Sequence, residues 1–472
     1  MRFVGRGEYF RWLDSELEKV AEDRGRLVAI RGRRQVGKSR LLTEWLRRRG
    51  GRYLYYQALN KPVDQELESF ARAVARSSLQ VLPPLAAGGT VWPGWEAALE
   101  ALAAEAAGSG PIVVVLDEFP YLVERDSSLE ATLQAAWDHT LQRRAILLIV
   151  VGSDLSMMEA IAGYGRPLYQ RIDVQRRVTP LSPPETADLL GQEPHEALDT
   201  YLVTGGFPKI VAARADHASD RAFLAAACSD EAHPLVFTGR QILDAEFPPH
   251  LAARSVLETI GCGESAWTRI RDRAAVDQST LSKTLDQLRE TGLVAAEEPL
   301  GARTFARRTR YRVADPYLRF WLRFLADQVP DIARGRGDLV RERIREGWQD
   351  YAGVAVEPLV REAIERLLPD ERFGAARYVG SWWTRDGSVQ VDLTGTARPE
   401  RSPQVEFAGS IKWRARRKFG PSDVKDLDAL AVQVPGWAPS SRRIGVSRTG
   451  FTATADLDVR LTPDDLLEAW ER

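Results

Sequence analysis

The sequence feature that most constrains the fold is the stretch GRRQVGKSR, which runs from Gly32 to Arg40. A glycine followed after four residues by Gly-Lys-Ser has the spacing of a phosphate-binding loop. The apolar run RLVAI precedes this stretch, and SRLLTEWLRRR follows it with apolar residues at helical spacing. We therefore expect a buried strand, a tight loop and a helix in succession. This context favours a phosphate cradle over the alternative, a basic turn between a strand and a helix.

The loop predicts a nucleotide site, because its backbone N–H groups and the positive end of the following helix can surround a polyphosphate. Glycines permit the backbone angles and the close approach that such a loop needs. Lys38 is expected to reach the β- and γ-phosphates, and the hydroxyl of Ser39 is expected to bind Mg²⁺. The residues predicted to line the cofactor here are Gly32, Arg33, Arg34, Gln35, Val36, Gly37, Lys38, Ser39 and Arg40.

A second, acidic element is expected downstream, because Mg²⁺ needs another carboxylate and the attacking water needs a positioning group. The segment PIVVVLDEFPYL supplies it, since its apolar run indicates a fully buried parallel strand that ends at Asp117 and Glu118. Asp117 is the expected second partner of Mg²⁺, and Glu118 is the expected base that orients and deprotonates water. The alternative is a pair of solvated acids that cap the next helix. Another strand candidate, RYLYYQAL, separates the two elements in the sequence and favours the additional-strand class of ATPases over kinases and GTPases.

Three further residues are candidates for reporting or stabilising the γ-phosphate. The apolar run AILLIVV leads to Ser153, which would serve as a polar sensor, because adjacent parallel strands end at the same crevice. An ordinary helix cap is the equal alternative for this serine. Arg166 and Arg171 follow on an expected loop, where either an arginine finger or a solvated loop arginine is consistent with the pattern.

Six segments in this order resemble the archaeal-type ATPases, relatives of the signal-transducing NTPases with numerous domains (STAND) within the AAA+ assembly. They are FVGRGEYFRWLDSEL, the phosphate loop, VVVLDEFPYL, VVGSDLSMME, GRPLYQR and YLVTGGFPKIV. The resemblance implies ATP as the nucleotide, with Val4, Gly5 and Arg6 bordering the adenine. It also implies that Pro208 of the GGFP motif approaches the base and helps to report the nucleotide state. Gly7 departs from the family pattern, which has Arg-Glu there.

The composition narrows the class of protein further. With 44% hydrophobic and 28% charged residues, no apolar run of about 18 residues and no signal-peptide pattern, we expect a cytoplasmic protein without a membrane segment. Two cysteines exclude a disulfide framework and a cysteine-based zinc site. The formal net charge is −1, from 65 basic and 66 acidic residues, so any affinity for nucleic acid must come from a local patch.

The region after the ATPase strands has the pattern of a helical lid followed by a winged helix. LAARSVLETI, AWTRIRDRA and DQSTLSKTLDQLRETGLV predict three helices, of which Asp277 or Ser279 can cap the third. Two strands around Gly301 would form a wing, which carries five arginines and no acid from Arg303 to Arg312. DNA binding is one expectation for this region, and a packing or partner module is the other. The candidate DNA contacts are Ser279, Thr280, Ser282, Lys283, Arg307, Arg308 and Arg310.

The C-terminal part resembles the nuclease-like tail, of the restriction-endonuclease superfamily, that is often fused to archaeal-type ATPases. This resemblance implies that Glu357, Asp392 and Lys412 are remnants of a metal-dependent nuclease site. Ser410 stands where the superfamily has a metal-binding acid. Glu406 shares its strand face but lies about 13 Å away, so it does not easily substitute. We therefore expect a degraded nuclease with a binding or regulatory role.

The predicted architecture is an α/β P-loop NTPase with an additional-strand parallel sheet and a helical lid, followed by a winged helix and an α/β nuclease-like domain. The expected boundaries are 1–183 for the ATPase core, 184–248 for the lid, 249–314 for the winged helix and 315–472 for the tail. One expected function is an ATP-binding and ATP-hydrolysing regulatory ATPase, whose nucleotide state controls the winged helix and the nuclease-like tail, with DNA as a candidate partner. A homo-oligomer is expected if an arginine finger comes from a second copy. The alternative is an ATP-gated, metal-dependent DNA nuclease.

Overall fold

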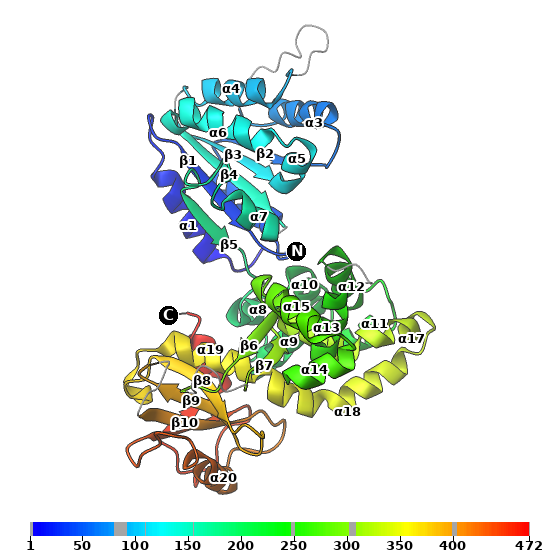
Figure 1. Cartoon of the computed structure of the whole chain (residues 1–472), viewed down its shortest axis with the longest axis vertical. Coiled ribbons are helices and arrows are strands. Elements are labelled where there is room, and N and C mark those ends of the chain that lie inside the picture. The colour runs from blue at the N-terminus through cyan, green and yellow to red at the C-terminus, as the bar shows by residue number, and fades with distance from the viewer. Residues whose placement is uncertain are drawn as a thin grey trace. The chain divides into compact units, whose positions relative to one another are not determined.

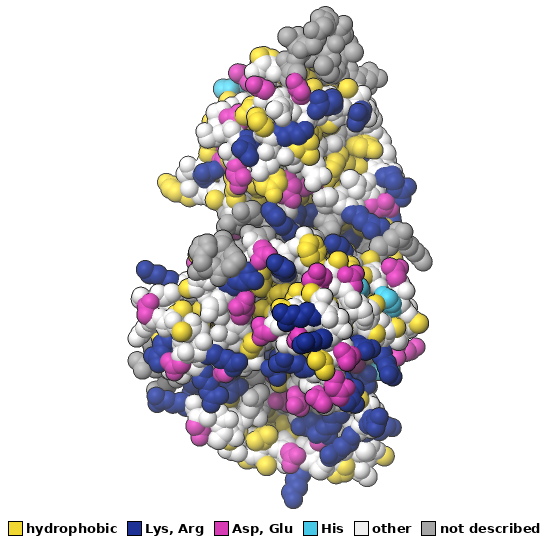
Figure 2. Space-filling model, turned by 90° about the vertical axis from the view of Figure 1, so that its right-hand side faces the viewer, with side chains coloured by type: hydrophobic (Ala, Val, Ile, Leu, Met, Phe, Trp, Pro, Cys, Tyr) yellow, Lys and Arg dark blue, Asp and Glu magenta, His cyan; other side chains and the backbone are white. Residues whose placement is uncertain are grey.

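The computed structural model describes residues 3–79, 92–108, 110–153, 155–246, 251–301, 308–398 and 404–471 (Figure 1). The chain divides into two compact units, Met1–Pro180 and Leu181–Arg472. None of the helices in these described ranges combines the length and the apolar character that a membrane span requires. Basic and acidic side chains are interspersed on the face of the second unit drawn in Figure 2, as expected from the nearly balanced charge.

The first unit contains a five-stranded sheet in the order β2-β3-β4-β1-β5, in which every neighbouring pair is parallel. Strand β4 therefore lies between the strand of the phosphate loop, β1, and the strand of Asp117, β3. The predicted α/β fold with a parallel sheet and an additional strand is confirmed. The strand RYLYYQ, which separates the two motifs in the sequence, lies at the edge of the sheet instead. The strands are β1 (Arg26–Arg31), β2 (Arg52–Gln57), β3 (Ile112–Asp117), β4 (Ile146–Gly152) and β5 (Val174–Arg177).

The burial of these strands follows from their positions in the sheet. All residues of β3 and β4 are buried, because helices cover both faces of a parallel sheet. One face packs on a core that includes Phe70, Trp95 and Trp137 from the helices after β2 and β3. Helices α1 and α2 carry further buried leucines. The indole N–H of Trp45 on α2 donates to Asp14 on α1 at 2.9 Å. The helices of this unit are α1 (Gly7–Glu18), α2 (Lys38–Arg49), α3 (Val63–Ala75), α4 (Trp95–Glu105), α5 (Phe119–Arg125), α6 (Leu129–His139), η2 (Leu141–Arg143) and α7 (Leu155–Ile161).

The second unit begins with helices and continues into a segment with the element order expected of a winged helix. Asp277 caps the third helix of that segment by accepting from the N–H groups of Ser279 and Thr280, as the sequence predicted. Strands β6 and β7 pair antiparallel. The helices of the expected lid are α8 (Pro183–Leu190), α9 (Pro194–Thr204), α10 (Pro208–Ala215), α11 (Asp220–Ala227) and α12 (Pro234–Glu246). The elements of the expected winged helix are α13 (Ala252–Gly261), α14 (Trp267–Ala274), α15 (Gln278–Glu290), β6 (Val294–Glu297) and β7 (Arg310–Val313).

The C-terminal part contains a mixed sheet in the order β12-β11-β10-β9-β8. Strands β8, β9 and β10 are antiparallel neighbours, whereas β10, β11 and β12 are parallel. Helix α20, which lies between β10 and β11 in the sequence, packs on the sheet. The stretch YAGVAVEPLVREAIERLL is divided between α18 and α19, because Pro358 suits the first turn of a new helix and not a helix interior. The elements are α16 (Pro316–Phe324), η3 (Ala326–Gln328), α17 (Val329–Ala333), α18 (Gly337–Ala355), α19 (Glu357–Leu367), η4 (Glu371–Phe373), β8 (Tyr378–Trp383), β9 (Gln390–Thr396), β10 (Val405–Lys412), α20 (Pro421–Ala431), β11 (Arg442–Ser447), β12 (Val459–Leu461) and α21 (Pro463–Glu468).

The two glycines of the GGFP motif form the turn between α9 and α10. Both have left-handed backbone angles, with φ of 56° at Gly205 and 70° at Gly206. A Cβ at Gly206 would lie 2.0 Å from the carbonyl oxygen of Leu181, and one at Gly205 would lie 2.7 Å from Tyr317. Packing inside the second unit therefore requires both glycines. This requirement does not depend on any contact between the GGFP motif and the nucleotide.

Replacing Gly206 with alanine is expected to destabilise the second unit by about 3 kcal/mol. Of this, about 1 kcal/mol comes from the left-handed backbone and the rest from displacing the Leu181 backbone. The matched control is Gly191→Ala, because Gly191 also has a positive φ, 61°, but a Cβ there meets nothing within 4 Å. Thermal unfolding of the full chain measures both variants. Equal losses of melting temperature would show that the contact with Leu181 does not matter.

Candidate nucleotide-binding site

The phosphate loop has the backbone that its sequence predicts. It joins β1 to α2, and two of its residues, Gln35 and Gly37, have positive φ values of 67° and 89°. At the start of the loop, a Cβ at Gly32 would lie 2.5 Å from the carbonyl oxygen of Val178, so only glycine fits there. The loop leads straight into the N-terminus of α2, where the helix dipole favours an anion.

The ammonium group of Lys38 lies within the loop. Its Nζ donates to the carbonyl oxygens of Gly32 at 2.7 Å and Arg33 at 3.0 Å, and to the hydroxyl of Ser153 at 2.9 Å. Burial lowers the pKa of Lys38 to about 8. The two carbonyl acceptors hold a positive charge at the position where phosphate oxygens would be bound, and anionic oxygens would replace them as stronger partners.

Ser39 and Asp117 meet as the sequence predicted for a Mg²⁺ site. The Ser39 hydroxyl donates to Oδ2 of Asp117 at 2.6 Å, and the buried carboxylate also accepts from the N–H of Glu118 at 3.0 Å. Hydroxyl and carboxylate oxygens suit Mg²⁺, so the pair fits this ion. Within the described ranges, no cluster of three or more His, Cys, Asp or Glu side chains could hold a metal ion. Mg²⁺ would therefore depend on phosphate oxygens and water beside Ser39 and Asp117.

Tyr55 is a site residue that the sequence reasoning missed. It lies on β2, which pairs with the strand of Asp117, and its hydroxyl donates to the same Oδ2 oxygen that Ser39 contacts. Burial and the charge of Asp117 raise the pKa of Tyr55, so the phenol stays a donor. The only signal in the sequence was that Tyr55, an aromatic residue with a polar hydroxyl, lies in an expected strand that is only partly apolar. That signal becomes specific once the pairing of β2 with β3 is known.

Glu118 and Ser153 form a chain of hydrogen bonds with Lys38. The Ser153 hydroxyl, which accepts from Lys38, donates to Oε1 of Glu118, and the Ser153 N–H donates to Oε2 at 3.3 Å. Glu118 has a φ of 55°, a left-handed angle that costs a non-glycine residue about 1 kcal/mol and turns it out of the strand direction. The structure thus brings three predicted residues, from β3, β4 and the loop, into one network.

Arg6 connects the N-terminal segment to the phosphate loop. Its guanidinium donates to the carbonyl oxygens of Val36 at 2.8 Å and Thr179 at 2.7 Å, and the arginine is buried. Gly5 and Arg6 both have positive φ values, 73° and 66°, so the segment turns sharply beside the loop. The expected contact of Val4, Gly5 and Arg6 with adenine stays a prediction.

The remaining residues of the loop differ in exposure. Arg33 and Val36 are buried, whereas Arg34 and Arg40 are exposed. The guanidinium of Arg34 donates to the hydroxyl of Tyr121 on α5 at 2.9 Å. This contact ties the rim of the loop to the helix that follows Glu118.

The two arginine-finger candidates lie elsewhere in the first unit and pair with α6. Arg166 Nε donates to the buried Glu130 at 3.0 Å, and Arg171 binds Asp138 through two nitrogens at 3.0 and 2.8 Å. The hydrogen bond from Arg171 lowers the pKa of Asp138. Neither arginine joins the network of Lys38 and Glu118, so a finger role stays a prediction. Pro208 begins α10 in the second unit, and its approach to the base also stays a prediction.

In the tail, the structure brings Glu357 and Asp392 together. Burial, with the charge of Asp392 adding to it, raises the pKa of Glu357 to about 7. Asp392 accepts from the Ser410 hydroxyl at 3.2 Å and from the N–H of Ile411 at 2.9 Å. Lys412 follows at the end of β10. The nuclease-like assignment of Glu357, Asp392 and Lys412 stays a prediction.

Two details of the tail bear on metal binding there. Arg361 lies between carboxylates, 3.2 Å from Glu357 and 3.2 Å from Glu297. It thus supplies a fixed positive charge beside Glu357. Glu406 accepts from the N–H of Ala375 at 3.2 Å, so it is engaged away from Ser410, as its position on the strand suggested.

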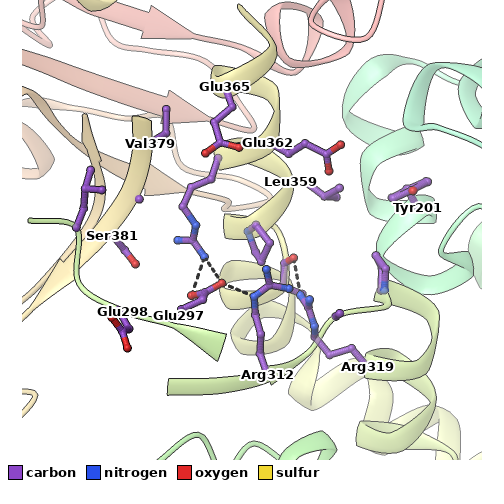
Figure 3. A pocket seen from close by; sticks show the side chains of 17 residues that line it. Tyr201, Glu297, Glu298, Arg312, Arg319, Leu359, Glu362, Glu365, Val379 and Ser381 are labelled. Carbon is purple, nitrogen blue, oxygen red and sulfur yellow. Dashed lines mark hydrogen bonds and ion pairs between the residues drawn. The ribbon is translucent and has the colours of Figure 1, made fainter. Parts of the chain in front are cut away.

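A cavity of about 660 Å³ lies between the expected winged helix and the tail (Figure 3). Glu297 of β6 pairs there with Arg312 of β7 as well as with Arg361. Arg319 is partly buried beside them and donates to the carbonyl oxygens of Val313 and Ala355 at 2.9 and 3.0 Å. These charges are internally paired, so they hold the two parts together.

The structure places Arg310 against the tail, and its expected contact with phosphates stays a prediction. Its guanidinium lies over the ring of Trp383, 4.5 Å from the centroid, and donates to Gln390 at 2.8 Å. The Trp383 N–H in turn donates to the carbonyl oxygen of Arg308 at 3.1 Å. The base of the wing is therefore packed on β8 and β9 of the tail, because the guanidinium stacks on the ring of Trp383, a tryptophan that is itself buried. Arg307 lies outside the described residues.

The third helix of the expected winged helix is only partly available for contacts. The hydroxyls of Ser279 and Thr280 both donate to Asp277, which caps the helix. Ser282 and Lys283 are exposed on the same helix. DNA contact by these residues stays a prediction.

Comparison with known proteins defines the class of the first part of the chain. Residues 13–213 match an ATPase domain found predominantly in Archaea. Residues 321–421 match a family of archaeal and bacterial proteins of unknown function. Together with the parallel sheet and the loop geometry, this shows that the chain contains an archaeal-type P-loop ATPase domain.

Archaeal proteins are among the individual proteins that are similar to this chain. A protein of Methanocaldococcus jannaschii, named only as uncharacterized, is 23% identical over 437 residues, which are 91% of this chain and 90% of that protein. A Walker-type ATPase of Pyrococcus abyssi has the similar fold, with a TM-score of 0.54 and 19% identity over 68% of this chain and 96% of the other. The ORC2 protein of Aeropyrum pernix gives a TM-score of 0.44 and 17% identity over 72% of this chain and 93% of the other.

Removing the Tyr55 hydroxyl is expected to weaken the Mg²⁺ site without disturbing the loop. In Tyr55→Phe, Asp117 loses a donor that orients it, so the Mg²⁺ concentration needed for tight ATP binding should rise about tenfold. The control is Tyr53→Phe on the same strand. Binding of a fluorescent ATP analogue, titrated with Mg²⁺, measures the effect. An unchanged Mg²⁺ dependence in Tyr55→Phe would show that Ser39 and the backbone suffice to orient Asp117.

Proposed function

We propose that this protein is a regulatory ATPase, which binds ATP with Mg²⁺, hydrolyses it slowly and uses the nucleotide state to rearrange its second unit. The observation that carries the proposal is the network in which Lys38, Ser153 and Glu118 share hydrogen bonds beside the Ser39 and Asp117 pair. This network joins the residues for phosphate contact, metal binding and water activation within one site.

Binding rests on the loop and on Lys38. Phosphate oxygens would take the place of the carbonyl oxygens of Gly32 and Arg33 as partners of the ammonium group. Ser39 and Asp117 would hold Mg²⁺, which neutralises charge on the phosphates when it is bound. A bound anion also favours the protonated form of Lys38, whose pKa is lowered to about 8, mainly by burial.

Hydrolysis rests on Glu118. Its carboxylate is the group that would orient water and accept its proton, and Ser153 fixes both of its oxygens. When Lys38 turns toward phosphate, Ser153 loses one partner and keeps Glu118. Ser153 can therefore report the γ-phosphate to the base, which is the sensor role that its position suggested.

Regulation of the second unit is supported by α9. This helix ends at the Gly205 and Gly206 turn, and its Asp199 binds the Trp413 N–H at 2.8 Å and the Arg448 guanidinium at 2.7 Å. Asp199 is largely buried, so its carboxylate is costly to leave unpaired. A shift of the GGFP turn would thus move the tail through α9. If the turn changes its position with the nucleotide state, the tail would change its position with the turn.

A second copy of the chain and DNA are the partners that we propose. Arg166 and Arg171 are paired with α6, so an arginine that completes the site would have to be released or be supplied by another copy. The exposed side of α15 is one surface on which DNA could be bound.

The alternative function, an ATP-gated nuclease, is favoured by one observation, the helix and three antiparallel strands that place Glu357 near Asp392. Ser410 opposes it, because a serine beside Asp392 gives Mg²⁺ one carboxylate fewer. We therefore propose that the tail does not cut DNA.

The division of roles in the ATPase site is tested by two variants. Lys38→Ala should bind ATP at least about tenfold more weakly, because a charge-assisted contact is lost. Glu118→Gln should bind ATP normally and lose about 100-fold or more in turnover. The control is Arg47→Ala, an exposed position at the far end of α2. Wild-type turnover in Glu118→Gln would remove Glu118 from the role of base.

The tail is tested by incubating plasmid and single-stranded DNA with Mg²⁺ or Mn²⁺. We expect no cleavage by the wild type, and a gain of Mg²⁺ affinity in Ser410→Glu, which places a second carboxylate beside Asp392. Glu406→Ala should behave as the wild type. Cleavage by the wild type that requires Mg²⁺ and disappears in Asp392→Ala would favour the gated nuclease.

A further inference from the structure

We propose that the segment from Lys412 to Lys418, KWRARRK, is a contact surface for the phosphate backbone of duplex nucleic acid. The segment, named here the 412–418 loop, follows β10 in the tail and contains five basic residues and no acid. Residues 415–418 are exposed. The inference goes beyond the proposed ATPase function and does not depend on it, because it rests on the charge and the shape of the tail.

The loop is held in place from both sides. The indole N–H of the buried Trp413 donates to Asp199 at 2.8 Å, and its carbonyl oxygen accepts from Gln349 at 2.7 Å. Near the other end, the carbonyl oxygen of Arg417 accepts from Thr449 at 2.9 Å. The backbone is thus fixed before any ligand arrives, which lowers the entropy cost of binding.

Nearby acids neutralise only part of the charge. Asp423 is buried, pairs with Arg414 at 2.9 Å and lies 3.9 Å from Arg417, whose side chain stays 62% exposed. Among the residues that the structure describes, Arg416 and Lys418 form no ion pair with an acid. Positive charge therefore accumulates at the outer edge of the loop, where a polyanion can reach it.

On α18, within the described part of the second unit, the charge is not one-sided. The exposed Arg341, Arg343 and Arg345 of this helix alternate with acids, and Arg345 pairs with Glu342. Basic and acidic side chains are likewise mixed over the face drawn in Figure 2. In a chain with a net charge of −1, the 412–418 loop is the kind of local patch that nucleic-acid binding requires.

The chemistry of the loop favours a phosphate backbone over other anionic partners. Three of its five basic residues are arginines, whose planar guanidinium groups bind phosphate in a bidentate manner. A membrane surface is less suitable, because its only large apolar side chain, Trp413, is buried and cannot enter lipid. At the base of the wing, Arg310 is already stacked on Trp383.

Binding of the full chain to a fluorescent duplex of about 30 base pairs, measured at several salt concentrations, tests the proposal. The triple variant R416A, R417A and K418A should bind at least about tenfold more weakly at low salt. The slope of log K against log salt should decrease by about 2 to 3, at roughly 0.9 for each lost phosphate contact. The matched control, R341A, R343A and R345A on α18, should change affinity less than about threefold.

Two further measurements make the outcome decisive. Both triple variants should keep the melting temperature and the ATPase rate of the wild type, so that a loss of duplex binding is separated from unfolding and from failure of the ATPase. Vesicles of phosphatidylcholine and phosphatidylserine provide the second anionic surface. Absence of duplex binding by the wild type, equal affinity and salt slope in the loop variant, or loop-dependent binding to vesicles alone would each overturn the proposal.

Discussion

The pairing of β4 with both β1 and β3 is the constraint on which the first unit depends. Because all three strands are parallel, their carboxyl ends meet at one edge, and each is followed at once by a functional segment. The loop follows β1, Asp117 ends β3, and Ser153 follows β4. No side chain has to reach far, so short hydrogen bonds can join Lys38 to Glu118 through Ser153. The buried apolar runs of β3 and β4 hold this edge rigid.

Buried charges have the corresponding role in the second unit. Arg361 connects the strand of Glu297 with the helix of Glu357, and Asp199 connects α9 with Trp413 and Arg448. Breaking one partner of such a pair leaves a desolvated charge, so these contacts fix which parts of the chain move together. They also place the ends of the GGFP turn and the 412–418 loop on one connected path through α9. The proposed response of the tail to a change at that turn rests on these contacts.

The sequence predicted well where local chemistry decides the structure. The loop spacing, the fully apolar runs of β3 and β4, and the cap by Asp277 each depend on neighbouring residues, and each is present as expected. The contact of Arg310 with Trp383 was not predicted, because this partner lies far along the chain. The break between α18 and α19 has a local cause as well, because Pro358 lies in the first turn of α19.

By itself, the sequence determined the residue types at the nucleotide site: the glycines and Lys38 of the loop, and the acids that end a buried strand. A motif of this kind is contiguous, and its backbone requirements act over a few residues. Only the tertiary structure decided that β4 lies between β1 and β3, that Tyr55 donates to Asp117, and that Arg166 pairs with Glu130. These contacts join residues that are distant in the chain, and lateral strand order and side-chain pairing depend on packing that no local pattern specifies.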